Sequence, residues 1–279
     1  MFGKLVRSFR IKNGLSQTVF VDMVQRSSAK FDSLDVVTLS RWERGVTKPH
    51  LTRQNNLLEL LGVDIFDVWE GESKANPISR KVNANSYIDE SSENNIKVVV
   101  INATNLSQLN KYLQLVDVIF DSDKNFILSK LNEVGARRIS TMEKILELHS
   151  SEMVLVTVHG QLVGHLISVD SNELSSRFKI PLEKDEPVRL ILSFNATTQF
   201  SFVATLGREV YKLVQSLNPE KKLSVFVKDK AMFDILYNLG FSYKTFGGAN
   251  NRQKLMMLTK DKVKSERVWM QIVRGYKGE

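Results

Sequence analysis

Apolar residues recur every three or four positions along the first part of the chain, which is the spacing of helices with one buried face. Phe2, Val6 and Phe9 share one face of the first such segment, and an Asn-Gly pair ends it because both residues tolerate left-handed geometry. Ser16 and Asp35 precede later segments as N-cap residues. The pattern therefore predicts helices over residues 2–13, 16–24, 35–45 and 51–62.

The second half of the chain alternates short β-branched runs with amphipathic segments. Such runs predict strands over residues 96–101, 188–194, 222–227, 242–247 and 254–259. Helical spacing returns over residues 104–120, 125–148, 201–217 and 229–239. The sequence VLVTVHGQLVGHLISV predicts a hairpin within 153–169, with His159-Gly160 at its turn. Strands and helices in this order indicate an α/β or α+β fold with a mixed sheet.

Composition changes between these two halves. The segment 71–95 is rich in Ser, Asn, Glu and Lys and contains few large apolar residues, so it is predicted to be a linker. The net charge of +8 is uneven, because residues 1–53 hold ten Lys/Arg and four Asp/Glu. A basic segment of this kind is typical of a phosphate-binding module, although a solvated helical surface would look the same.

Cysteine is absent, which excludes disulfides, thiolate zinc sites and cysteine nucleophiles and fits a reducing cytoplasm. No apolar run approaches the ~20 residues that a membrane helix needs, so a cytoplasmic protein without membrane contact is expected. The four histidines, at positions 50, 149, 159 and 165, show no metal-ligand spacing, and no metal site is predicted.

The segment VTLSRWERGVTKP has the character of a helix that reads DNA. Such a helix needs polar or small residues at its exposed start and an apolar inner face, here Leu39 and Trp42. Arg41 is suited to guanine, Thr38 to a base or a phosphate, and the valines to thymine methyl groups. Gln17 and Lys48 are placed for phosphate contacts. The predicted DNA-binding residues are Gln17, Val36, Val37, Thr38, Arg41 and Lys48.

The motifs GLSQ, VTLSRWERGVTKP and LLELLGVD, in this order and spacing, resemble the Cro/cI (XRE) helix-turn-helix family over residues 1–67. The resemblance implies sequence-specific binding of double-stranded operator DNA, commonly by a homodimer on a palindromic site. It also implies that Glu43 forms an ion pair inside the module. One departure is the polar segment 26–34, about eight residues longer than the usual turn, which is expected to bulge outward as a loop. A helical bundle used for protein contacts is the alternative.

The hairpin, VRLILSFNATTQFSFVATLGREVYKLVQSL, LSVFV and AMFDILYNLGF together resemble the GNAT N-acetyltransferase superfamily over about residues 96–260. That family implies acetyl-CoA, or another acyl-CoA, held by backbone amides in a glycine-rich loop after the fourth strand. The corresponding loop here has no glycine and carries Phe200 and Phe202, both expected to lie in the core. The candidate acyl-CoA or ligand loop comprises Phe194, Asn195, Thr197, Thr198, Gln199 and Ser201.

Acyl transfer would also need a general base and a general acid. The resemblance places the family tyrosine at Leu236, and Tyr237 would point about 100° around the helix. Tyr237 and Glu186 are the weak catalytic candidates, and Tyr237 is otherwise a half-buried packing residue. The GNAT-like domain is therefore expected to have kept the acetyltransferase fold with a degenerate cofactor loop.

Taken together, these resemblances predict a multidomain protein: an all-α helix-turn-helix domain at 1–70, a polar linker at 71–95, an α/β (α+β) GNAT-like domain with a mixed sheet at 96–262, and an amphipathic tail at 263–279. The expected function is a transcriptional regulator whose GNAT-like domain senses a ligand, dimerises or binds a partner. The alternatives are an active acetyl-CoA-dependent N-acetyltransferase carrying a DNA-binding or protein-interaction domain, and a protein whose N-terminal bundle is an interaction module.

Overall fold

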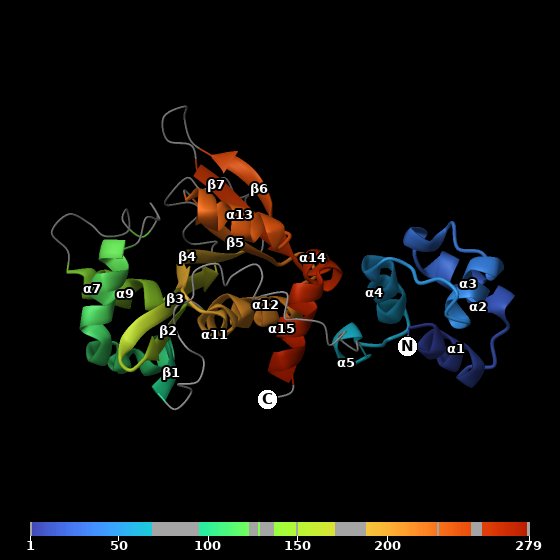
Figure 1. Ribbon diagram of the computed structural model, residues 1–279, viewed down its shortest axis with the longest axis horizontal. Coiled ribbons are helices and arrows are strands. Elements are labelled where there is room, and N and C mark those ends of the chain that lie inside the picture. Colours follow the sequence, from blue (N-terminus) through green and yellow to red (C-terminus); the bar gives the residue numbers. More distant parts are fainter. Residues whose placement is uncertain are drawn as a thin grey trace. The chain divides into compact units, whose positions relative to one another are not determined.

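The computed structural model describes residues 2–68, 95–122, 128, 137–148, 150–170, 188–227, 229–246 and 253–277 (Figure 1). The chain divides into two compact units. The first, called the N-terminal unit, comprises residues 1–73 and 264–274, and the second, called the sheet unit, comprises 74–263 and 275–279. Nearly all of the predicted linker 71–95 lies outside the described residues.

Within residues 2–68 the structure has helices and no strand. They are α1 (Phe2–Lys12), α2 (Gln17–Ser27), the 3₁₀ turn η1 (Ala29–Phe31), α3 (Val36–Glu43), α4 (Leu51–Leu60) and α5 (Ile65–Val68). The predicted caps are confirmed, because the Ser16 side chain accepts from the amide of Val19 and that of Asp35 accepts from the amide of Thr38. These bonds satisfy amides that a helix leaves unpaired at its first turn.

The N-terminal unit has a small apolar core in which the segment between α2 and α3 takes part. Phe31 is fully buried and Leu34 is almost so. The expectation that 26–34 bulges outward is correct for most of the segment, which is exposed, and wrong for Phe31 and Leu34, which turn into the core. Phe31 and Leu34 are its two large apolar side chains, and burying them outweighs the polarity of their neighbours.

The sheet unit contains one mixed seven-stranded sheet with the order β1-β2-β3-β4-β5-β7-β6. The strands are β1 (Ile96–Asn102), β2 (Glu152–Val158), β3 (Gln161–Asp170), β4 (Val188–Ala196), β5 (Lys222–Val227), β6 (Ser242–Phe246) and β7 (Gln253–Thr259). Neighbouring strands are antiparallel except for the parallel pair β4 and β5. The predicted mixed sheet is confirmed.

The turn between β2 and β3 is where the sequence placed it. His159 and Gly160 both have positive φ, at 50° and 81°. Two successive residues of this kind form the turn whose twist matches the twist of the paired strands. Gly160 takes this conformation without strain, and the turn fixes the register of the hairpin.

Helices cover both faces of the sheet (Figure 1). Met153 and Leu155 of β2 face a core completed by α7 and α9, whereas Val156 packs on the opposite face against Ala204 of η5. The alternation follows from the two-residue repeat of a strand. The helices of the sheet unit are η4 (Ala103–Tyr112), α7 (Leu113–Ser122), α9 (Arg138–Leu146), α11 (Gln199–Phe202), the π segment η5 (Val203–Gly207), α12 (Arg208–Gln215) and α13 (Lys230–Asn238).

The predicted tail forms two helices, α14 (Lys260–Ser265) and α15 (Arg267–Lys277). Val268, Trp269 and Val273 on α15 are buried, as its amphipathic sequence indicates. Among the helices that the structure describes, none is long and apolar enough to span a lipid bilayer.

Candidate functional site

The helix α3 presents the predicted reading residues on its outer face. Val37 is 58% exposed and Arg41 is exposed, while Val36 and Thr38 are half-buried. On the opposite face, Leu39 and Trp42 are buried, and Trp42 meets Phe2 edge to face at 6.0 Å between ring centroids. The eight residues of α3 therefore separate into an anchored side and a free side, as predicted.

An ion-pair cluster locks α3 against α1 and α2. Arg10 Nε and Nη2 donate to Glu43 Oε1 and Oε2 at 2.6 and 2.8 Å, and Gln17 Nε2 donates to Oε2 at 2.8 Å. Burial by itself would raise the pKa of Glu43, but the hydrogen bonds from Arg10 and Gln17 hold that pKa below its usual value. The predicted ion pair of Glu43 is confirmed, and this cluster of Arg10, Gln17 and Glu43 is called the α3 clamp.

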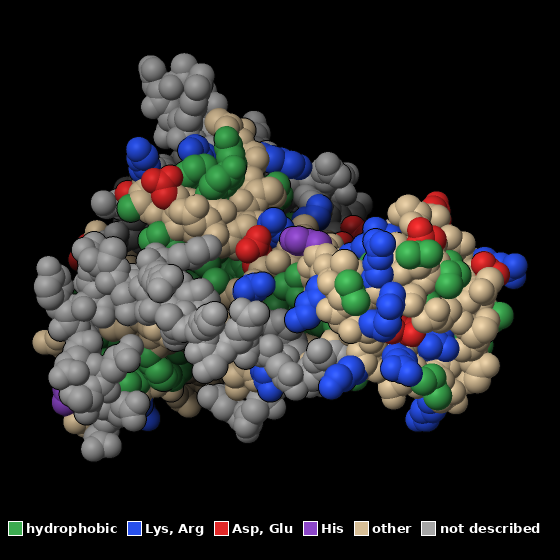
Figure 2. Space-filling model, turned by 45° about the vertical axis from the view of Figure 1, so that its right-hand side comes forward, with side chains coloured by type: hydrophobic (Ala, Val, Ile, Leu, Met, Phe, Trp, Pro, Cys, Tyr) green, Lys and Arg blue, Asp and Glu red, His purple; other side chains and the backbone are tan. Residues whose placement is uncertain are grey.

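The clamp uses the amide of Gln17, which was predicted to contact phosphate. The side chain is half-buried, and its Nε2 donates to Glu43. A contact between Gln17 and a DNA phosphate stays a prediction. Lys48 is exposed after α3, in the loop that leads to α4. Figure 2 shows Lys and Arg side chains spread over the N-terminal unit, in agreement with the basic sequence of residues 1–53.

The candidate acyl-CoA loop follows β4 and leads into α11. Thr197 donates both its amide and its hydroxyl to the carbonyl of Val163, at 2.9 and 2.8 Å. The amide of Ser201 donates to Thr198 Oγ1, and the amide of Thr198 donates to Ser201 Oγ, each at 3.0 Å. Three amides that could face a phosphate are thus already used inside the chain.

The start of α11 is also pressed against β3. A Cβ atom at Gly164 would lie 2.6 Å from the Cβ of Ser201, so only glycine permits this approach. Asn195 and Thr197 are exposed, Phe194 and Gln199 are half-buried, and Ser201 is fully buried. With the amides of Thr197, Thr198 and Ser201 paired and the helix start seated on the sheet, this loop is poorly suited to a pyrophosphate.

The two phenylalanines of this loop behave differently. Phe202 is buried and meets Phe194 edge to face at 6.1 Å, which confirms its predicted place in the core. Phe200 is 44% exposed, and its predicted place in the core is wrong. In the first turn of α11 it points away from the strands on which Phe202 packs, since two residues are about 200° apart on a helix.

Neither weak catalytic candidate is placed beside this loop by a described contact. Tyr237 on α13 is 55% exposed, more than the half-buried packing residue expected, and stacks on Phe233 with 5.7 Å between ring centroids. Tyr243 on β6 completes this aromatic group at 6.2 Å from Tyr237. Glu186 lies outside the described residues.

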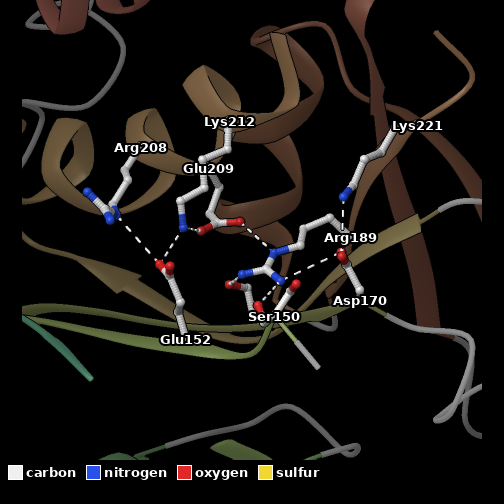
Figure 3. A network of polar contacts seen from close by, with 9 residues as sticks. Ser150, Glu152, Asp170, Arg189, Arg208, Glu209, Lys212 and Lys221 are labelled. Atoms are coloured by element: carbon white, nitrogen blue, oxygen red, sulfur yellow. Dashed lines mark hydrogen bonds and ion pairs between the residues drawn. The ribbon is translucent and has the colours of Figure 1, made fainter. Parts of the chain in front are cut away.

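The sheet unit has a second cluster that the sequence did not reveal, drawn in Figure 3. At its centre is Arg189 at the start of β4, whose Nε donates to Glu209 Oε2 at 2.9 Å and whose Nη2 donates to Ser168 Oγ at 2.8 Å. Its Nη1 donates to the carbonyl of Ser150 and lies 3.6 Å from Asp170 Oδ1. Burial would lower the pKa of Arg189, but Glu209 and Asp170 outweigh this and raise it.

Further charges extend this cluster outward. Lys212 donates to Glu152 and, at 3.1 Å, to Glu209, while Lys221 Nζ lies 3.3 Å from Asp170 Oδ2. Burial would raise the pKa of Glu209, yet the charges of Arg189 and Lys212 hold it below its usual value. The residues Ser150, Glu152, Ser168, Asp170, Arg189, Arg208, Glu209, Lys212 and Lys221 are called the β4 cluster (Figure 3).

A cavity of about 400 Å³ opens beside the β4 cluster. Its wall includes Ser151 and Asp170 with the basic residues Arg189, Lys212 and Lys221. One sequence signal could have indicated the β4 cluster. Arg189 stands inside the otherwise apolar strand VRLILSF, and a charge buried there requires a partner of opposite charge. Among the described residues, no group of three or more His, Cys, Asp or Glu side chains could hold a metal ion.

No family model and no curated protein matches the sequence. Among solved structures, an uncharacterized protein from Bacillus halodurans has a TM-score of 0.41 at 11% identity, covering 64% of this chain and 92% of its own. A ribosomal-protein-alanine N-acetyltransferase from Brucella melitensis has 0.40 at 11% identity, with 58% and 99% covered. An N-acetyltransferase from Staphylococcus aureus has 0.39 at 12% identity, with 59% and 99% covered.

Proposed function

We propose that this chain is a sequence-specific DNA-binding transcriptional regulator. In this proposal the N-terminal unit is a Cro/cI-like helix-turn-helix domain that binds a palindromic operator as a homodimer. The sheet unit is a GNAT-like domain that serves ligand sensing, dimerisation or partner binding rather than acetyl transfer. The outer face of α3 carries this proposal, since its exposed Val37 and Arg41 lie on a helix fixed from behind.

The α3 clamp holds this face in a fixed position, as DNA reading requires. A reading helix must hold its side chains in a fixed frame before DNA arrives, because ordering them on binding would cost affinity. Glu43, at the end of α3, is held by Arg10 of α1 and Gln17 of α2, so the helix cannot rotate without breaking a buried ion pair. The basic charge of residues 1–53 adds attraction for the phosphate backbone.

Selection of DNA tests the proposal directly. The full-length chain is incubated with a library of random duplexes, bound duplexes are sequenced, and the enriched sequence is titrated by fluorescence anisotropy at several salt concentrations. We expect an enriched palindrome and a steep loss of affinity with rising salt, because bound phosphates release counterions. Absence of binding to any duplex at low salt would refute the proposal.

Arg41→Ala separates reading from charge. If Arg41 contacts a base, its loss weakens the selected site by about 1–3 kcal/mol and relaxes preference at one position. Arg137→Ala is the matched control, since Arg137 is exposed in the sheet unit and the change in charge is the same. Unchanged site preference in Arg41→Ala would show that α3 is not the reading helix.

One observation favours an active N-acetyltransferase as a second candidate. The pairing of β4 with β5 ends at Ile191 and Val225, although β4 continues to Ala196. The two parallel strands therefore separate at the end that leads into the candidate acyl-CoA loop. The amides of Thr197 and Ser201 are nevertheless engaged, as described above. Calorimetric titration of the full-length chain with acetyl-CoA decides between the two: tight binding, with acetyl transfer that is lost in Tyr237→Phe, would favour the enzyme.

A further inference from the structure

Two buried oxygen atoms in the wall of the β4 cavity have no hydrogen-bond partner among the described residues. They are Asp170 Oδ1 and Ser151 Oγ. Asp170 Oδ2 is occupied by Lys221 at 3.3 Å, while Oδ1 has only the ion pair with Arg189 at 3.6 Å, which is too long for a hydrogen bond. Buried acceptors are normally paired, because an unpaired one loses its hydration without compensation.

A molecule that donates hydrogen bonds to Asp170 Oδ1 and Ser151 Oγ would therefore be stabilised in this cavity. A carboxylate oxygen accepts only, and a serine hydroxyl accepts readily, so an ammonium group would satisfy both atoms. It would also meet the negative charge of Asp170, which strengthens such bonds.

The wall also carries two lysines, and one of them, Lys221, is itself paired with Asp170. Lys212 and Lys221 have side chains that are 34% and 27% exposed, so part of each reaches water. An ammonium has three donors, and Lys212 uses two of them on Glu152 and Glu209. A carboxylate could take the remaining donors of Lys212 and Lys221. Among the described residues, the wall carries three cations and three anions, so a ligand without net charge leaves this balance unchanged.

We propose that this cavity binds a small zwitterion of the amino-acid class, with its ammonium at Asp170 and Ser151 and its carboxylate at Lys212 and Lys221. The size agrees, since about 400 Å³ is within the range of small-molecule sites. The site is distinct from the candidate acyl-CoA loop. Arg189 and Asn195 stand six residues apart on β4, which places the two sites about 20 Å from each other along the strand.

This inference deepens the proposed function, because it gives the ligand-sensing role of the sheet unit a site and a chemical class. The full-length chain, without DNA, is titrated calorimetrically with each standard L-amino acid. Each amino acid that binds is compared with its decarboxylated amine and its deaminated acid. We expect at least one amino acid to bind, and both truncated analogues to bind about tenfold more weakly or worse, since each loses a charged hydrogen-bond set.

Asp170→Asn and Ser151→Ala identify the ammonium end, and Asp234→Asn, on exposed α13, is the matched control. We expect about a tenfold loss in Asp170→Asn, a smaller loss in Ser151→Ala and no change in the control. Lys221→Gln should weaken the amino acid more than its amine analogue, because the amine has no carboxylate for Lys221 to bind. If Asp170→Asn does not fold, as judged by circular dichroism, Ser151→Ala still tests the site.

Absence of binding by every amino acid, or binding that Ser151→Ala and Lys221→Gln leave unchanged, would overturn the inference. Neither result touches the DNA proposal, which the duplex selection tests separately. The operator is finally titrated with and without the bound amino acid. An amino acid that binds in the cavity while the chain ignores all DNA would leave the site standing and refute the regulator alone.

Discussion

The α3 clamp and the β4 cluster are both sets of charges with a buried carboxylate at the centre, Glu43 in the clamp and Glu209 in the cluster. Both join elements far apart in the chain, yet they differ in how completely their oxygen atoms are hydrogen-bonded. In the clamp, both oxygens of Glu43 accept hydrogen bonds, from Arg10 and from Gln17. In the β4 cluster, both oxygens of Glu209 also accept hydrogen bonds, but Asp170 Oδ1 has no hydrogen-bond partner among the described residues. The clamp supports a helix, whereas the cluster borders a cavity.

The difference shows how a buried charge can be assigned a role. A saturated set is complete within the chain and fixes geometry, because every group has exchanged water for a protein partner. A set with an unpaired acceptor beside a cavity can bind a ligand that donates a hydrogen bond to that acceptor.

The largest expected effect is in the saturated part of the β4 cluster. Glu209→Gln removes a charge whose side chain is fully buried and leaves Arg189, 8% exposed, without its main counter-charge. We expect a loss of about 3–5 kcal/mol in the free energy of unfolding of the sheet unit, as for other broken buried pairs. Urea unfolding followed by circular dichroism measures it, with the exposed Glu220→Gln as control.

A double replacement sharpens this result. Arg189→Met with Glu209→Leu removes both charges, so most of the lost stability should return if the penalty comes from an unpaired charge. Stability equal to wild type in Glu209→Gln alone would mean that the buried pair contributes nothing, and the description of the cluster as a saturated structural set would fail.

A somewhat smaller effect is expected at His165 on β3, a buried polar residue in which one ring nitrogen is hydrogen-bonded and the other is not. Its Nε2 is 2.7 Å from Ser193 Oγ, its Nδ1 has no partner among the described residues, and burial lowers its pKa to about 4. In the unfolded chain His165 has its ordinary pKa of 6.5, so as the pH falls the unfolded state binds a proton at this residue before the folded state does. Stability is therefore full above pH 6.5 and falls by roughly 3 kcal/mol towards pH 4.

The measurement is the difference in urea midpoint between wild type and His165→Gln at several pH values. Carboxylates titrate in the same range in both proteins, so they cancel in the difference. We expect His165→Gln to lose less stability than wild type between neutral pH and pH 4. Parallel curves would show that His165 is protonated in the folded protein.

The smallest of the three effects is expected in the α3 clamp. Glu43→Gln keeps the shape and removes the charge opposite Arg10, whose side chain is 13% exposed and can regain water. A loss of roughly 1.5–3 kcal/mol follows for hydrogen bonds to a charged group. Hydrogen exchange should rise in α3 and in the facing turns of α1 and α2, with Glu59→Gln, a surface carboxylate on α4, as control. Unchanged exchange in α3 would show that the clamp does not hold the helix.

Local signals carried much of the fold. The caps Ser16 and Asp35, the His159-Gly160 turn and the positions of the strands were readable because each depends on neighbouring backbone atoms or on a repeat within one element. The burial of Phe31 in the segment 26–34 was not predicted, for the opposite reason. Its segment is polar on average, and only the space between α2 and α3 decides that one aromatic ring turns inward.

The candidate sites divide in the same way. The outer face of α3 followed from sequence, since helical spacing fixes which residues share a side and Trp42 marks the inner one. The loop after β4 was suspected because it lacks glycine, but the pairing of its amides with Val163 and Thr198 needed the structure. The exposure of Phe200 and Tyr237 also had no local signal.

What the sequence by itself determined was therefore the local geometry: where helices and strands begin, which turn joins β2 to β3, and which side of α3 is free. Only the tertiary structure decided which charges meet. Arg189, Glu209 and Asp170 come from three different elements, and their value depends on desolvation and on distances that a linear pattern does not contain. A buried ion pair, and equally an unpaired oxygen in a cavity, exists only once the chain has excluded water around it.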